Sequence, residues 1–188
     1  MEQQYQDDPQ TQANAVWGLG NAYLQVGSAF WDGNEKDQAL EVFDKTKSQF
    51  ERLMKDFPWH KHAADAQFGI GNIAERKGEC DQAIRIYEQV AIKLKGDARI
   101  RSLIGLGRCL FKTGDHQKAV DNFVKVALFY EGSPEFASEA LWWAGQCYEK
   151  LNQIDKAIQQ YRELIQKYPN TKYFEEAKKR LEQLGGGK

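Results

Sequence analysis

Histidine and cysteine are the residues of this chain with the widest scope for catalysis or metal binding. His60 and His62 flank a single lysine, and three cysteines are spread over the sequence, at Cys80, Cys109 and Cys147. A zinc site needs three or four Cys, His or carboxylate ligands at close spacing, and no such set adjoins the two histidines. An odd number of cysteines without a Cys-x-x-Cys pair also gives no disulfide framework. The sequence therefore predicts no metal, no cofactor and no enzyme activity, with the histidines in a solvated loop.

Two Gly-x-Gly segments, which begin at Gly69 and Gly105, raise the question of phosphate binding. A phosphate-binding loop follows a strand and opens a helix, whereas both segments lie inside helical patterns. The charge balance of 26 Lys and Arg against 27 Asp and Glu gives a net charge of -1, which argues against nucleic acid as a partner. Base stacking on aromatic side chains beside Arg101 and Arg108 is the nucleic-acid alternative.

The sequence contains an internal repeat. Three segments align without a gap at offsets of 36 and 38 residues, namely GIGNIAERKGECDQAIRIYEQV, GLGRCLFKTGDHQKAVDNFVKV and WAGQCYEKLNQIDKAIQQYREL. A fixed period of this length is typical of an array of small structural units. The matched positions are a glycine, then an alanine, then an aromatic residue: Gly71, Gly107 and Gly145; Ala83, Ala119 and Ala157; Tyr87, Phe123 and Tyr161.

Each copy has helical periodicity on both sides of a short polar turn, which predicts a helix-turn-helix unit. Two antiparallel helices cross closely only where one presents a small side chain, so we expect the glycine of the first helix to face the alanine of the second. An earlier copy carries Gly20, Ala39 and Phe43, with seven extra residues between the glycine and the alanine. Seven residues are about two helical turns, which predicts longer helices in this first pair.

These residues resemble the tetratricopeptide repeat family, although the family's tryptophan position is occupied here by Val16, Gln67, Leu103 and Leu141. The resemblance implies an all-α, right-handed superhelical solenoid of about four helix-turn-helix repeats with a C-terminal capping helix. The segment from Tyr161 to Leu184 is most similar to bacterial TolA-binding, Tol-Pal-associated and outer-membrane assembly lipoproteins. The expected organisation is a loosely ordered or disordered N-terminus at 1–12, a single domain at 13–184 with repeats at about 13–58, 62–96, 98–133 and 135–170, a cap at 172–184 and a tail at 185–188.

The resemblance also implies that the first helices line a concave surface. Residues three before and one after each matched glycine share one helix face, and residues one turn further on continue it. Aromatic side chains with amides beside them suit an extended peptide or a partner helix. The alternative is that the aromatics pack against the neighbouring repeat, as we expect for Trp143. The predicted lining is Trp17, Asn21, Phe68, Asn72, Arg76, Arg101, Ile104, Arg108, Phe111, Trp142 and Gln146.

The partner expected from this surface is a protein or peptide. Some family members bind chaperone C-termini through a basic clamp, but Trp17 stands where its lysine is expected and Asp65 adds the opposite charge. We therefore favour a mixed peptide with an apolar anchor, and a self-associating component of a cell-envelope or other assembly as the alternative. No apolar run is long enough to insert in a membrane, and the N-terminus lacks a leader pattern. The chain as written is expected in the cytoplasm, or in the periplasm if a signal or lipid anchor precedes it.

Overall fold

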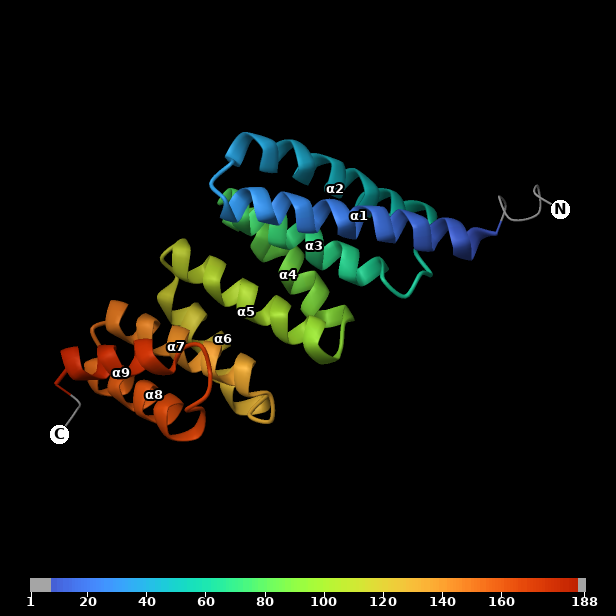
Figure 1. Ribbon diagram of the computed structural model, residues 1–188. Helices are drawn as coiled ribbons and strands as arrows, with labels where there is room; N and C mark the ends of the chain where they lie inside the picture. Colours follow the sequence, from blue (N-terminus) through green and yellow to red (C-terminus); the bar gives the residue numbers. More distant parts are fainter. Residues whose placement is uncertain (1–7, 186–188) are drawn as a thin grey trace. The chain divides into compact units, whose positions relative to one another are not determined.

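The computed structural model describes residues 8–185, and this part of the chain is built from helices without a strand (Figure 1). The expected all-α array of helix pairs with a final capping helix is confirmed. The helices are α1 Pro9–Asp32, α2 Lys36–Asp56, α3 Ala63–Lys77, α4 Cys80–Lys93, α5 Gly96–Lys112, α6 His116–Phe129, α7 Pro134–Lys150, α8 Ile154–Lys167 and α9 Phe174–Gln183. Among these helices, none is both long and apolar enough to cross a membrane.

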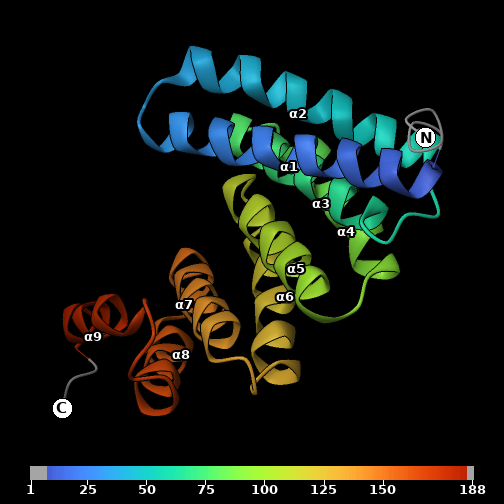
Figure 2. The same cartoon turned by 45° about the vertical axis from the view of Figure 1, so that its right-hand side comes forward.

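The chain divides into two compact units, Met1–Gln82 and Ala83–Lys188, which we call unit 1 and unit 2. In unit 1, α2 contacts both α1 and α3. In unit 2, each helix from α5 to α9 contacts the next one along the chain, and α7 also contacts α5 (Figure 2). A helix that packs mainly on its sequence neighbours is the signature of a repeat array. The two units are described separately below.

The first helix begins earlier than the sequence predicts. Asp8 accepts hydrogen bonds from the backbone N–H groups of Gln10 and Thr11, at 3.2 and 3.0 Å, and Pro9 occupies the first helical turn. An aspartate cap followed by proline is a strong start signal, because the carboxylate accepts hydrogen bonds from unpaired N–H groups of the first turn and proline has no N–H to leave unpaired there. Residues 9–12 are therefore helical rather than loosely ordered. Residues 1–7 and 186–188 of the predicted terminal segments lie outside the described residues.

A residue with left-handed backbone conformation stands in each turn between paired helices. Gly78 and Gly114 have φ of 80° and 89°, while Asn34 and Asn152 have φ of 64° and 57°. Glycine and asparagine tolerate this conformation because they meet little steric penalty there. The same turn chemistry thus recurs in all four helix pairs.

The conserved geometry of the helix pairs depends on an aromatic ring lying against glycine. A Cβ atom added at Gly107 would lie 2.6 Å from the Phe123 ring, and one added at Gly145 would lie 2.4 Å from the Tyr161 ring. The nearest neighbour of each of these glycines is therefore a ring, and not the alanine that the sequence predicts. The missing side chain makes room for the aromatic residue four positions after that alanine, and a flat ring fills the space more completely than a methyl group.

The first helix pair is longer than the others, as expected, and its extra turns carry a second crossing. α1 has 24 residues and α2 has 21, against 14 to 17 in the helices from α3 to α8. Near the turn, Gly27 lies against the Phe43 ring. Two turns further from it, Gly20 lies against the Phe50 ring, so the partner of Gly20 is Phe50. Repeating the contact keeps the longer pair close along its length.

Candidate functional site

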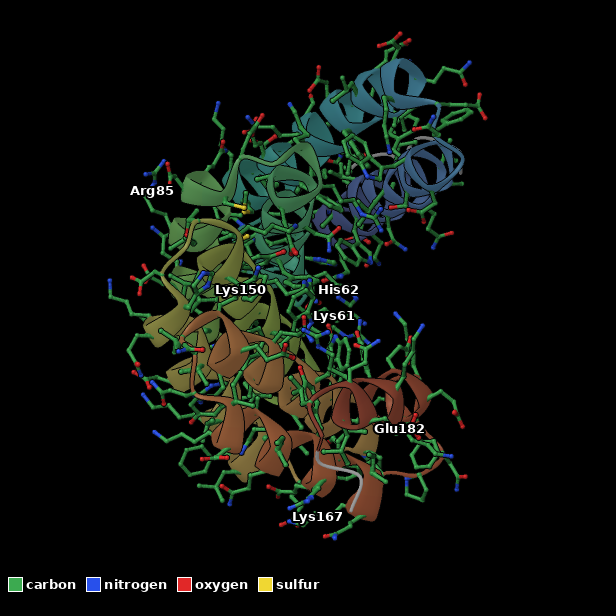
Figure 3. All side chains as sticks on the ribbon, turned by 90° about the vertical axis from the view of Figure 1, so that its left-hand side faces the viewer. Lys61, His62, Arg85, Lys150, Lys167 and Glu182 are labelled. Carbon is green, nitrogen blue, oxygen red and sulfur yellow. The ribbon has the colours of Figure 1, made fainter. Side chains whose placement is uncertain are left out.

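A three-ring stack occupies the predicted surface in unit 1. Trp17 on α1 lies 5.5 Å from the Phe50 ring of α2 and 4.5 Å from the imidazole of His62, at interplanar angles of 22° and 12°. His62 stands directly before α3, and its Nδ1 lies 2.7 Å from a carboxylate oxygen of Asp65. Two rings therefore pack against the indole of Trp17, which stays half-buried. Figure 3 labels His62 and its neighbour Lys61.

The same arrangement recurs in unit 2. Trp142 on α7 lies 5.5 Å from the Tyr161 ring of α8 and 6.1 Å from the Tyr173 ring. Tyr173 stands directly before α9, as His62 stands before α3. In both units, a tryptophan thus packs against an aromatic residue of its own helix pair and against the residue that stands directly before the next helix. Three packed rings fix the indole in one orientation without a long flexible side chain.

A polar network extends from the Trp142 stack along α7. Gln146 donates a hydrogen bond to the Tyr161 hydroxyl, which donates to a Glu149 carboxylate oxygen, both at 2.6 Å. The Arg180 guanidinium of α9 binds both oxygens of Glu149, with Nε at 2.9 Å from each. Although burial opposes the charge of Glu149, these donors hold the pKa of its carboxyl below the usual value. The network ties the capping helix to the predicted surface.

A second ion pair joins the first helices of neighbouring repeats in unit 2. Arg108 on α5 binds Glu139 on α7 at 2.8 Å, and both side chains are about one-fifth to one-quarter exposed. Burial and the Glu139 carboxylate raise the pKa of the Tyr173 hydroxyl to about 12, so this phenol stays protonated at neutral pH. One turn before Ile104, the exposed Arg101 lies over the Phe136 ring at 5.9 Å. The face of α5 and α7 therefore presents both signs of charge beside the tryptophan.

The remaining predicted residues of unit 1 form a smaller polar group. Arg76 on α3 binds Asp32 at the end of α1 at 2.9 Å, and its Nε donates to the Asn72 side chain at 3.3 Å. Asn21 and Phe68 are half-buried. These side chains thus leave part of their surface open on α1 and α3.

The structure removes Ile104 from the predicted surface and packs the half-buried Phe111 against its neighbours. Ile104 is 2% exposed and belongs to the core of unit 2, so it cannot contact a partner. Phe111 packs against His116 and Trp143 at ring distances of 5.1 and 5.3 Å, and Trp143 in turn stacks on Phe123, as expected for a residue between repeats. Ile104 occupies the same position in its repeat as Trp142 does in the last repeat, but its shorter side chain ends within the core.

The loop before α3 is less solvated than the sequence predicts. His60 is 4% exposed, and its Nε2 lies 3.0 Å from the Asn14 side-chain oxygen. Burial, with the neighbouring His62 and Lys61, lowers the pKa of His60 below its usual value. His60 therefore acts as a neutral packing residue at neutral pH, and the expectation of a solvated loop is wrong for it.

The three cysteines are buried, and burial raises the pKa of the Cys147 thiol to about 12. A thiol with a raised pKa is a poor nucleophile, which fits a packing role. Within residues 8–185, His, Cys, Asp and Glu nowhere gather in a set of three that could hold a metal ion.

Comparison with known families explains the repeated geometry. Two family models, both described as tetratricopeptide repeat, match residues 27–99 and 139–171, which together make up more than half of the chain. The chain belongs to the tetratricopeptide repeat family. Tetratricopeptide repeat proteins are in general non-catalytic protein-interaction modules, which supports the assignment of this chain as an interaction scaffold.

Among curated proteins, the chain is similar to lipopolysaccharide assembly protein B of Escherichia coli K12. The two are 26% identical over 162 residues, which is 85% of this chain and 37% of that protein. The chain thus spans little more than a third of the length of this relative. The likeness fits the narrower resemblance to bacterial envelope-assembly members of the family.

Two solved structures share the fold. PcrH, a Pseudomonas aeruginosa protein crystallised with the chaperone binding region of PopB, matches with a TM-score of 0.57 and 18% identity, over 66% of this chain and 96% of that one. YrrB, described as a tetratricopeptide repeat protein with an unusual peptide-binding site, matches with a TM-score of 0.58 and 18% identity, over 92% and 98%.

Proposed function

We propose that this chain binds a segment of a protein partner, as an extended peptide or a helix, along the faces of its first helices. The observation that carries the proposal is the Trp142 stack with its flanking charges. An indole held by two rings loses little conformational entropy on binding, and tryptophan and arginine dominate the affinity of many protein interfaces. The proposed contacts are the edge of Trp142, the Arg108 and Glu139 pair, and Gln146. In unit 1 the corresponding contacts are Trp17, Asn21 and Asn72.

The charges of unit 2 indicate the chemistry of the bound segment. Arg101 and Arg108 can take carboxylates, while Glu139 can take a lysine or arginine. A segment with one apolar anchor and charges of both signs therefore fits better than a purely acidic tail.

The ring contacts of the two tryptophans argue against nucleic acid as the partner. Stacking of a base needs an open aromatic face, and two rings already pack against each of Trp17 and Trp142. The edge of an indole offers an N–H group and apolar carbons, which suit a peptide. Solved neighbours with a bound protein segment or a peptide-binding site, PcrH and YrrB, support the same choice.

The test begins with selection of peptides from a displayed library on the immobilised chain. A selected peptide is then titrated against the wild type, Trp142→Ala and Arg108→Ala, with fluorescence polarisation as the measurement. We expect the affinity to fall about tenfold or more for Trp142→Ala, because loss of a central aromatic anchor typically costs about 2 kcal/mol. Arg108→Ala should weaken peptides that carry a carboxylate and leave neutral ones unchanged.

The matched control is Trp59→Ala, which removes an indole that is 54% exposed and lies outside the candidate surface. This variant should bind as the wild type does. Circular dichroism melting curves confirm that each variant is folded. Equal affinity of the wild type, Trp142→Ala and Arg108→Ala for all selected peptides would show that the partner binds elsewhere.

A second candidate function is that of a self-associating component of a cell-envelope assembly. The likeness to lipopolysaccharide assembly protein B favours the envelope, although it covers 37% of that protein. A chain that stays monomeric at every concentration would rule out the second candidate, because self-association requires a second copy, whereas a dimer is compatible with both candidates.

A further inference from the structure

The first helix has a composition unlike that of any later helix. From Pro9 to Ala29, α1 carries no Asp, Glu, Lys or Arg, and its single charged residue is Asp32 at the end. The helices α2 and α4 to α9 have acidic or basic residues among their exposed positions, and α3 has no exposed position. Terminal elements of a repeat array normally have a polar outer face, since this face meets water. α9 follows that rule with five exposed charged residues, Glu175, Glu176, Lys178, Lys179 and Glu182 (Figure 3 labels Glu182).

A regularly spaced row of exposed apolar residues runs along α1, with uncharged polar residues such as Gln12, Asn14 and Gln25 also exposed on this helix. Leu19 and Val26 are 44% and 47% exposed, and Ala15, Ala22 and Ala29 are exposed as well. We call these five residues the α1 stripe. Their spacing of four, three, four and three residues is the heptad pattern of helices that pair side by side.

The stripe is complementary to itself. Small and large side chains alternate along it, as Ala15, Leu19, Ala22, Val26 and Ala29. When two copies lie antiparallel and are offset by one step, Ala15 of one helix can face Val26 of the other and Ala22 can face Leu19, so that a small side chain meets a large one. Gly18 lies beside the stripe, and a Cβ atom added there would meet nothing within 4 Å, so a second helix can approach closely.

We propose that the chain forms an antiparallel dimer through the α1 stripe. Such a contact is isologous, since the same face serves both copies, and the absence of charge removes like-charge repulsion at the two-fold axis. The stripe from Ala15 to Ala29 is about 21 Å long and about 10 Å wide. It therefore buries less than the about 800 Å² per partner of a standard interface, and the dimer should dissociate on dilution.

The inference is independent of the proposed peptide-binding function. Trp17 lies two residues from both Ala15 and Leu19, which places its side chain away from the stripe. The peptide-binding proposal and the dimer proposal can thus be confirmed or contradicted separately.

Sedimentation velocity of the full chain over a wide concentration range tests the dimer. We expect the wild type to shift from the monomer mass of 21.6 kDa to twice that mass as concentration rises. The double variant Leu19→Lys with Val26→Lys and the double variant Leu19→Glu with Val26→Glu should each stay monomeric through charge repulsion. Mixing these two variants should restore a species of twice the monomer mass, which shows that both variants are folded.

The control is Leu128→Lys with Phe129→Lys on α6, which replaces two apolar residues that are 69% and 72% exposed. This variant should dimerise as the wild type does. A wild type that stays monomeric at every concentration overturns the proposal. A dimer that persists in the Leu19→Lys, Val26→Lys variant, or is lost in the α6 control, overturns the assignment to α1.

Discussion

At the scale of single residues, a glycine lies against an aromatic ring at the crossing of three helix pairs, α1 with α2, α5 with α6 and α7 with α8. The glycines could be found from the sequence because they recur at a fixed period, but their partners could not. Gly145 and Ala157 are both small, and the repeat does not show which of them lies against Tyr161. That choice depends on the crossing angle of the helices, which follows from all the side chains between them.

Replacement of Gly145 by alanine should therefore destabilise the chain. The added Cβ would lie 2.4 Å from the Tyr161 ring, whose hydroxyl is bound by Gln146 and Glu149, so the ring cannot move away without loss of these bonds. Overpacking of this kind costs about 1–3 kcal/mol. The measurement is the free energy of unfolding in urea.

Gly18→Ala is the matched change at an open position, because an added Cβ there meets nothing within 4 Å. Alanine is the better helix former, so this variant should gain about 0.5–1 kcal/mol at protein concentrations where the chain is monomeric. Equal effects of the two substitutions would contradict the close contact at Gly145.

The candidate surface was predicted in part. Trp17 and Trp142 stand out because they are large aromatic residues in the same register. His62 and Tyr173, the third rings of the two stacks, were missed, since they lie in connections whose path depends on how the next helix enters. Ile104 stands at the same repeat position but is buried. The repeat position therefore predicts which way a side chain points, whereas the length of the side chain decides whether it is exposed.

At the scale of elements, α9 is held by a titratable contact. The pKa of Glu149 is lowered in the folded chain, so its contribution to stability is present above the ordinary value of 4.5 and is lost as the pH falls through the folded value. Protonation removes the charge that binds Arg180. We therefore expect the docking of α9 to weaken in acid.

Glu149→Gln should lose about 1–2 kcal/mol at neutral pH and show a smaller acid-dependent loss than the wild type, because the hydrogen bonds to a charged group are gone and Arg180 is partly exposed. Urea unfolding at neutral pH and near pH 3.5 provides the measurement. The control is Glu163→Gln, which breaks an exposed pair with Lys167 and should cost about 0.5 kcal/mol or less. An unchanged pH dependence in Glu149→Gln would exclude this carboxylate as the cause.

At the scale of the whole molecule, helices contact their neighbours along the chain within each unit. In such an array a local defect lowers the stability of adjacent helices more than that of distant ones. Gly145→Ala should therefore raise the hydrogen exchange of backbone amides in α7, α8 and α9 and leave α1, α2 and α3 unchanged. Exchange followed by mass spectrometry measures both groups in one sample, and a uniform rise over all helices would indicate a single cooperative block.

The charged outer face of α9 has a consequence for how many copies can join. A chain with an adhesive face at both terminal helices would add copies without limit and form filaments, whereas a chain with one such face stops at two. A pair formed through α1 would carry two copies of each proposed binding face. A partner with two suitable segments would then bind with a gain in avidity that depends on the spacing of those segments. The lysines and glutamates of α9 would thus limit the proposed assembly to two copies of the chain.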